Sequence, residues 1–288
     1  MMRHKMKFKK LLAVALIITM MSSLLGCSYS KKSDSSASGG GASSGSSTST
    51  LQNIIKNGKI KVGIMLTTAP FGMYDDKKKP TGLDVDYAQA LADSLGVELE
   101  LVDMTADNRI PSLETGKVDV VVGCFTITLE RSQKIAFTDP YLAMGSLMMV
   151  SADSKATSYK DLAGKKVGVV KSSANEAVAK SLGVDFKIVT FDATADADLA
   201  LENGQIDARI EDSTIMEYDA KEHPDKFKVI GENLTTPSYC GFGVAFGDQV
   251  WLNYLNEFIF EQTQNGFTDK TYKKWFGKES TMPLNPTY

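Results

Sequence analysis

The sequence is poor in the residues on which enzymes and metal centres most often depend. It has two histidines among 288 residues, His4 and His223, and three cysteines. Histidine is the commonest metal ligand and the usual general base near neutral pH. No Ser-His-Asp arrangement and no spacing typical of metal ligands can be assembled from this set. We therefore expect a protein without a metal or another cofactor, and not an enzyme.

An excess of positive charge is also missing. The chain has 32 Lys and Arg against 35 Asp and Glu, a formal net charge of −3. Five of the cations lie within the first ten residues (Arg3, Lys5, Lys7, Lys9 and Lys10), and without them the charge becomes −8. An acidic body with no basic stripe argues against a nucleic-acid partner.

Long apolar runs are absent except near the N-terminus. Leu11 to Leu25 is an apolar run of 15 residues, short for a membrane-spanning helix and typical of the core of a signal peptide. Leu24-Leu25-Gly26-Cys27 resembles a bacterial lipobox. That resemblance implies a signal peptide over residues 1–26, a lipid on Cys27, and a protein held at the outer face of the cell membrane. The alternative is an uncleaved anchor in which Cys27 is incidental.

The next segment is almost free of apolar residues. Ser28 to Thr50 consists mainly of Ser, Gly, Ala and Thr, which cannot bury enough apolar surface to offset its ordering entropy. With Cys27 it predicts a flexible tether over residues 27–50, about 25 Å in root-mean-square span. The 238 residues that follow suffice for one large or two medium domains.

Residues 51–288 alternate between strand and helix patterns, which favours an α/β fold with largely parallel sheets. The order strand, helix, strand, helix, strand occurs twice and so predicts two similar halves. Periodicity alone leaves open whether the C-terminal third extends the second half or returns to the first. The expected strands are 59–65, 99–102, 118–122, 166–170, 187–191, 208–210 and 239–246; the expected helices are 85–95, 111–114, 175–182, 196–202, 214–222, 249–265 and 268–276.

The segment after the apolar strand Val118–Val122 carries the clearest functional pattern. It places Thr126, Thr128 and Arg131 close to the end of that strand. Ligands of open α/β sheets bind at strand ends. Hydroxyl groups and a guanidinium suit a carboxylate, which Arg can meet with two parallel charge-assisted hydrogen bonds.

This segment, continued by Phe137-Thr-Asp-Pro-Tyr141, resembles the extracellular amino-acid-binding proteins of ABC importers (solute-binding family 3). Gly82–Tyr87 and Tyr272–Phe276 support the resemblance, which extends over residues 51–288. It implies a two-lobe periplasmic-binding-protein-like fold (type II) with two hinge crossovers. Lobe 1 would comprise residues 51–142 and 241–288, and lobe 2 residues 143–240. It also implies a monomer that closes on a free amino acid and delivers it to a membrane permease.

The resemblance assigns roles to individual residues. Arg131 would hold the α-carboxylate of the ligand, with Thr126 and the main chain around Cys124 beside it. The loop with Ser173 and Ala174 would complete the carboxylate site on closure.

Asp212 would meet the ligand ammonium, with Glu211 as the alternative. Asp212 is also a candidate N-cap of the following helix. Phe71 is the remaining aromatic candidate for the ligand site, or else a core residue.

The identity of the ligand stays open. Asn108-Arg109-Ile110-Pro111 resembles the motif of the glutamate/aspartate subgroup, in which the arginine meets the side-chain carboxylate; otherwise Arg109 is a surface residue paired with Asp107 or Glu114. Met65 carries neither the cation nor the anion common at its place in relatives, which favours a neutral polar amino acid or cystine instead.

Three further alternatives concern function and covalent structure. Some relatives of this fold are dehydratases, for which Glu211 would be the acid or base, and others are sensor ectodomains. Cys124 and Cys240 could form a disulfide or remain buried thiols.

Overall fold

The computed structural model describes residues 48–280 and residue 284. The predictions for the signal peptide (1–26), for lipidated Cys27 and for most of the tether lie outside these residues. No helix in the described part has both the length and the apolar character needed to cross a membrane.

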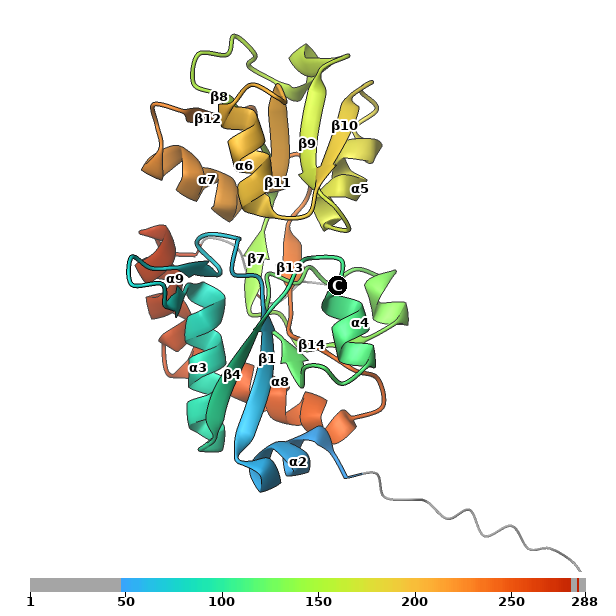
Figure 1. Cartoon of the computed structure of the whole chain (residues 1–288), viewed down its shortest axis with the longest axis vertical. Helices are drawn as coiled ribbons and strands as arrows, with labels where there is room; N and C mark the ends of the chain where they lie inside the picture. The colour runs from blue at the N-terminus through green and yellow to red at the C-terminus, as the bar shows by residue number, and fades with distance from the viewer. Residues whose placement is uncertain (1–47, 281–283, 285–288) are drawn as a thin grey trace, which may run out of the picture. The chain divides into compact units, whose positions relative to one another are not determined.

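The first sheet has five strands in the order β4-β1-β5-β14-β6 (Figure 1). Its centre is parallel, because β1 pairs with β4 on one side and with β5 on the other. Strand β14 joins it antiparallel from the C-terminal third of the chain. The elements of this half, called lobe 1 below, are α2 (Thr50–Asn57), β1 (Lys59–Ile64), β2 (Met73–Tyr74), β3 (Pro80–Thr81), α3 (Leu83–Leu95), β4 (Glu98–Asp103), α4 (Arg109–Glu114), β5 (Val120–Val121), η1 (Arg131–Gln133), β6 (Ala136–Phe137), β14 (Gly243–Val244), α8 (Gln249–Gln264) and α9 (Phe267–Phe276).

The second sheet also has five strands, in the order β10-β9-β11-β8-β12. Strands β10, β9 and β11 are parallel, and β8 and β12 complete the sheet antiparallel. The elements of this half, called lobe 2, are β8 (Ser146–Ser151), η2 (Tyr159–Leu162), β9 (Lys166–Val170), α5 (Ala174–Ser181), β10 (Lys187–Phe191), α6 (Thr194–Glu202), β11 (Ala208–Asp212), α7 (Ser213–Glu222) and β12 (Phe227–Ile230).

Two antiparallel strands connect the sheets. Strand β7 (Leu142–Met144) pairs with β13 (Ser238–Cys240), and the two carry the chain out of the first sheet and back to it (Figure 1). The C-terminal third therefore returns to lobe 1, which decides between the two layouts that periodicity left open. The lobe boundaries inferred from the resemblance remain a proposal.

The prediction of one continuous strand over 239–246 is wrong in one respect. This segment forms two strands, and they belong to different sheets. Strand β13 belongs to the crossover and β14 to the first sheet. Between them Phe242 accepts from and donates to Thr138, and Gly241 lies so close to Thr138 that an added Cβ would be 2.9 Å from its carbonyl oxygen. Because the apolar pattern continues through both strands, it does not indicate that they pair with different neighbours.

The start of the globular body also differs from expectation. Thr50, assigned to the tether, is the first residue of α2, and the helix has a capping box in which Ser49 accepts from the backbone N–H of Gln52 and the Gln52 side chain accepts from Ser49. Ser-x-x-Gln before a helix is a recognised start signal, which the surrounding Ser-rich composition obscured.

Gly82 fixes the entry to α3, the helix that presents Asp84 to the site described below. Its φ is 141°, and an added Cβ would lie 2.1 Å from the Phe71 carbonyl oxygen. We expect Gly82→Ala to destabilise the fold by about 3 kcal/mol or more through backbone strain and steric clash.

The matched control is Gly96→Ala at the end of the same helix. Gly96 also has positive φ, 65°, but nothing lies within 4 Å of an added Cβ. Its substitution should cost about 1–2 kcal/mol. Chemical denaturation measures both variants, and equal losses would contradict the role given to Gly82.

Candidate functional site

A small cavity lies where the two lobes meet. Its volume is about 30 Å³, and it is lined from both halves of the chain, at the ends of strands β1, β5, β9 and β11. That volume has room for water molecules but not for an amino acid in this arrangement of the lobes. Lobe 1 contributes Arg109, Cys124 and Thr126 among others, and lobe 2 contributes Ser173, Ala174, Asn175, Glu211 and Asp212.

Arg109 is buried at the cavity wall. It is 2 % exposed, and its guanidinium donates to the carbonyl oxygens of Ala106, Gly123 and Cys124 and lies 4.1 Å from the centre of the Phe125 ring. Burial, and next the charge of Arg131, lower its pKa to about 10, so it stays charged at neutral pH. The alternative of a surface residue paired with Asp107 or Glu114 is wrong.

Arg131 is also buried between the lobes, at 9 % exposure. Its Nη1 donates to the Thr126 carbonyl oxygen, and its Nη2 crosses to lobe 2 and donates to the Ser172 carbonyl oxygen at 2.9 Å. Burial lowers its pKa. It lines an adjoining hollow rather than the small cavity, and Ser173 and Ala174 border both spaces.

Cys124 lies in the loop that follows β5 and has an unusual backbone conformation. Its φ is +45°, a conformation that non-glycine residues seldom adopt. Asp84 accepts from the Cys124 N–H at 2.8 Å and from the Tyr141 hydroxyl at 2.7 Å. Burial raises the pKa of Asp84 to about 7, against the opposing effect of these two hydrogen bonds. The loop that carries Cys124 is thus held to α3 and to the start of the crossover.

Two adjacent carboxylates from lobe 2 reach the cavity. Asn175 donates to Glu211 at 2.8 Å and to Asp212 at 3.0 Å, and the Cys124 thiol donates to Asp212 across the lobes at 3.3 Å. Burial and then the charge of Asp212 raise the pKa of Glu211 to about 7, and burial also raises the pKa of Asp212.

Asp212 occupies the N-cap position of α7, but its side chain accepts no bond from that helix. Glu211 and Asp212 both line the cavity, so the choice of Asp212 over Glu211 as the partner of a ligand ammonium stays a prediction. The strand is longer than predicted and ends at Asp212, so both residues lie at its end.

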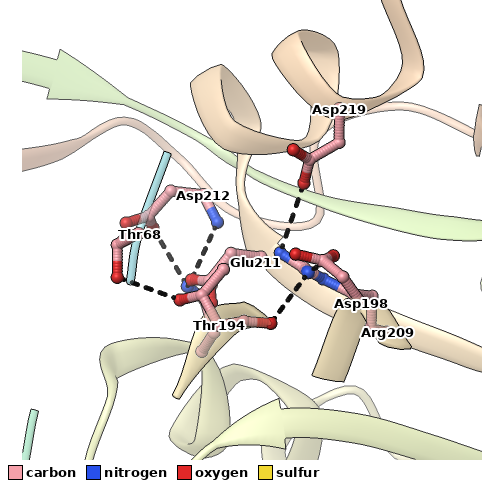
Figure 2. Close-up of polar contacts among 8 residues, drawn as sticks. Thr68, Thr194, Asp198, Arg209, Glu211, Asp212 and Asp219 are labelled. Carbon is pink, nitrogen blue, oxygen red and sulfur yellow. Dashed lines mark hydrogen bonds and ion pairs between the residues drawn. The ribbon is translucent and has the colours of Figure 1, made fainter. Parts of the chain in front are cut away.

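A pair of threonine hydroxyls joins the lobes on the cavity wall. Thr68 and Thr194 lie 3.2 Å apart, and both are buried (Figure 2). Thr194, at the start of α6, was not expected at the site, nor was Asn175. Both follow a strand of lobe 2 closely, so the strand-end rule that identified Arg131 could have found them.

The remaining predicted residues fall into two groups. Thr126, Ser173 and Ala174 line the cavity, and the Ser173 side chain caps α5 by accepting from the Glu176 N–H. Phe71 does not reach the site: it is 1 % exposed and packs 5.8 Å from Phe276 in the core of lobe 1. Its assignment to ligand binding is therefore wrong, and the core alternative holds.

Cys124 and Cys240 are both buried and both free. Within residues 48–280 no cluster of His, Cys, Asp and Glu could hold a metal ion.

Comparison with known proteins gives one family and several relatives. Residues 60–278 match the bacterial extracellular solute-binding proteins, family 3. The glutamine-binding protein of Geobacillus stearothermophilus is 34% identical over 251 residues, which are 85% of this chain and 95% of that protein. The glutamate/aspartate import solute-binding protein of Salmonella typhimurium is 28% identical over 250 residues, 82% of each.

A solved structure agrees with the fold. The ancestral amino acid-binding protein AncCDT-1, described as a precursor of cyclohexadienyl dehydratase, superposes with a TM-score of 0.75 at 38% identity, over 79% of this chain and 100% of that one. The chain therefore belongs to the bacterial extracellular solute-binding proteins of family 3, and the predicted two-lobe α/β fold is confirmed. The names of its relatives include glutamine, glutamate/aspartate, histidine, arginine and cystine, so the glutamate/aspartate subgroup stays a prediction.

A buried ion cluster supports the strand that carries Glu211 and Asp212. Arg209, 1 % exposed, pairs with Asp198 of α6 and with Asp219 of α7 (Figure 2). The cluster thereby fastens both helices to β11. Removing one partner of such a buried arrangement leaves uncompensated charge.

We expect Arg209→Met to destabilise the protein by about 3–5 kcal/mol, because buried Asp219 and partly buried Asp198 would lose their cation. The control is Lys226→Met, which removes an exposed ion pair with Glu202 and should cost under about 1 kcal/mol. Urea denaturation compares the two; a small loss for the Arg209 variant would contradict the supporting role of the cluster.

Proposed function

We propose that this protein captures a free polar amino acid between its lobes by hinge closure and delivers it to the permease of an ABC importer. The proposal rests on one observation: the buried charged side chains at the junction of the lobes lack counterions within the described part of the chain. Arg109 and Arg131 lie on one lobe, and Glu211 and Asp212 on the other. None of the four takes part in an ion pair of the described residues.

Buried charges are normally paired, because an isolated charge loses its hydration. Here the contacts of each one are with neutral groups: carbonyl oxygens, amides, a thiol and the Phe125 ring. A zwitterion would supply both missing counterions: its carboxylate suits the guanidinium side and its ammonium the carboxylate side. Since the two sets lie on different lobes, the ligand can contact both only in the closed state and so stabilises it.

The ligand we favour is glutamate or aspartate. The guanidinium groups of Arg109 and Arg131 suit the α-carboxylate and the side-chain carboxylate of such a ligand, and Arg109 lines the cavity directly. The relative that is named for glutamate and aspartate supports this choice, whereas the glutamine and cystine relatives support the alternative of a neutral polar amino acid or cystine. Uncharged Met65 in the cavity wall favours that alternative.

The cellular setting follows from the same proposal. We infer an extracytoplasmic, monomeric lipoprotein anchored through Cys27 and tethered to the outer face of the membrane. The name of its family as extracellular supports the location, and a relative named as the glutamine-binding protein of an ABC transporter supports the permease partner.

A dehydratase-like enzyme is the second candidate. The similarity to a protein described as a precursor of a dehydratase favours it, as does the raised pKa of Glu211, which suits an acid or base near neutral pH. Recovery of a bound acid unchanged after long incubation would favour binding without turnover.

Calorimetric titration of ligand-stripped protein with the twenty amino acids and cystine tests the proposal. Saturable heat with glutamate or aspartate is expected. Heat with cystine or a neutral amino acid alone would move the assignment to the alternative, and no heat or thermal shift with any of them would refute amino-acid binding.

Arg131→Ala should weaken the binding of whichever amino acid gives heat by about 30-fold or more, because it truncates one partner of a buried charge pair. Lys134→Ala is the matched control, since Lys134 is an exposed cation three residues away and should leave affinity unchanged. Equal affinities of the wild type and the Arg131 variant would refute the carboxylate role.

Affinity should depend on pH. Burial raises the pKa of Glu211 to about 7 in the ligand-free structure with its lobes in contact, and a ligand ammonium would stabilise the ionised form and lower that pKa in the complex. Affinity is then full above pH 7 and falls as the pH drops below it, by up to about tenfold per unit. Titrations between pH 5.5 and 8.5 measure this, and Glu211→Gln should flatten the profile. Tighter binding at acidic pH would contradict it.

A further inference from the structure

Two exposed ion pairs connect the lobes, and they lie in different places. In the first, called the mouth pair, Lys171 Nζ lies 3.1 Å from Asp107 Oδ2. In the second, called the hinge pair, Lys278 Nζ lies 2.6 Å from Glu217 Oε2. Each joins a residue of lobe 1 to a residue of lobe 2, and the side chains are similarly exposed, 52% and 36% in the mouth pair against 48% and 45% in the hinge pair.

Their surroundings distinguish the pairs. Asp107 borders the hollow that contains Arg131, and no residue of the crossover strands β7 and β13 lines that hollow. Glu217 and Lys278 border a hollow that includes Ala143 of β7. Of the two pairs, only the hinge pair shares a hollow with a crossover strand, so we expect a rotation about β7 and β13 to separate the mouth pair further.

The mouth pair also acts on the ligand site. Lys171 directly precedes Ser172, whose carbonyl oxygen accepts from Arg131, and Ser173 and Ala174 line the cavity. The loop 171–174 is thus fastened to lobe 1 at two successive residues. At Ser172 the contact is with the guanidinium of Arg131, which the proposed ligand would use. At Lys171 the contact is with Asp107, and neither residue of this ion pair lines the cavity.

We propose that Asp107 and Lys171 form a closure latch, an ion pair that sets how long the closed state retains its ligand without touching that ligand. The inference rests on the proposed function, because it assumes hinge closure. The latch favours the closed state, and apparent affinity scales with the fraction of closed protein.

Its strength is limited by solvent and by competing partners. Exposed ion pairs contribute little and are screened by salt. Asp192 and Glu176, both in lobe 2, also raise the pKa of Lys171, after the larger effect of Asp107. These two carboxylates can hold the Lys171 ammonium in lobe 2 when the lobes open. We therefore expect loss of the latch to change the rate of ligand release only modestly.

The first test measures dissociation of tritiated L-glutamate into excess unlabelled L-glutamate. Lys171→Gln and Asp107→Asn should each accelerate release about two- to fivefold, and the double variant no further, because each removes the same interaction. The difference should disappear in 1 M salt. Lys278→Gln, the matched control, should release L-glutamate at the wild-type rate.

The second test needs no ligand. Spin labels at exposed Lys117 in lobe 1 and Asp185 in lobe 2 report the distance between the lobes. Lys171→Gln should enlarge the long-distance population of the ligand-free protein, and Lys278→Gln should not. Equal effects of the two lysine variants, or additive effects of Asp107→Asn and Lys171→Gln, would overturn the latch. If L-glutamate does not bind at all, the proposed ligand fails while the spin-label comparison still decides the latch.

Discussion

The structure of the site depends on burying charges of opposite sign on two different lobes without pairing them with each other. Each lobe keeps its own charges in place with neutral partners, carbonyl oxygens for Arg109 and the amide of Asn175 for the acids. A buried charge without a counterion is costly. Under the proposed function, that cost would give a zwitterion the differential affinity for the closed state that hinge closure requires.

The fold keeps these charges in place with a second set of buried polar contacts behind them. On lobe 1, Asp84 holds the main chain of Cys124 and the Tyr141 hydroxyl. On lobe 2, Arg209 ties α6 and α7 to the strand that ends in Glu211 and Asp212. The first contact links the loop of Cys124 to α3, and the second links β11 to α6 and α7. Under the proposed hinge closure, each half of the site would therefore move as a unit with its own lobe.

Much of the fold could be predicted because its signals are local. Strands 166–170 and 187–191 have the predicted bounds, and α3 ends at Gly96 in the left-handed conformation expected of a helix terminus. The antiparallel strands β8 and β12 were missed. The change of sheet at Gly241 was also missed, because an apolar run shows that a segment is buried but not which strand it pairs with.

The candidate site was predicted in part for the same reason. Strand ends locate Arg131, Asp212 and the Ser173 loop, because ligands of open α/β sheets bind there. Phe71 was misassigned because an aromatic residue in a loop has the same local sequence whether it faces a ligand or the core. The pairing of Thr68 with Thr194 joins residues 126 positions apart, which no local pattern specifies.

The sequence by itself determined the α/β alternation, the threonine-arginine motif and the choice of charged residues, since these follow from periodicity and side-chain chemistry. Only the tertiary structure decided that the C-terminal third returns to lobe 1 and that Arg109 is buried. It also decided that Glu211 and Asp212 both face the junction and that Cys124 and Cys240 remain thiols. Each of these depends on which distant segments pack together, and packing is decided by the complete set of contacts rather than by the neighbours of a residue along the chain.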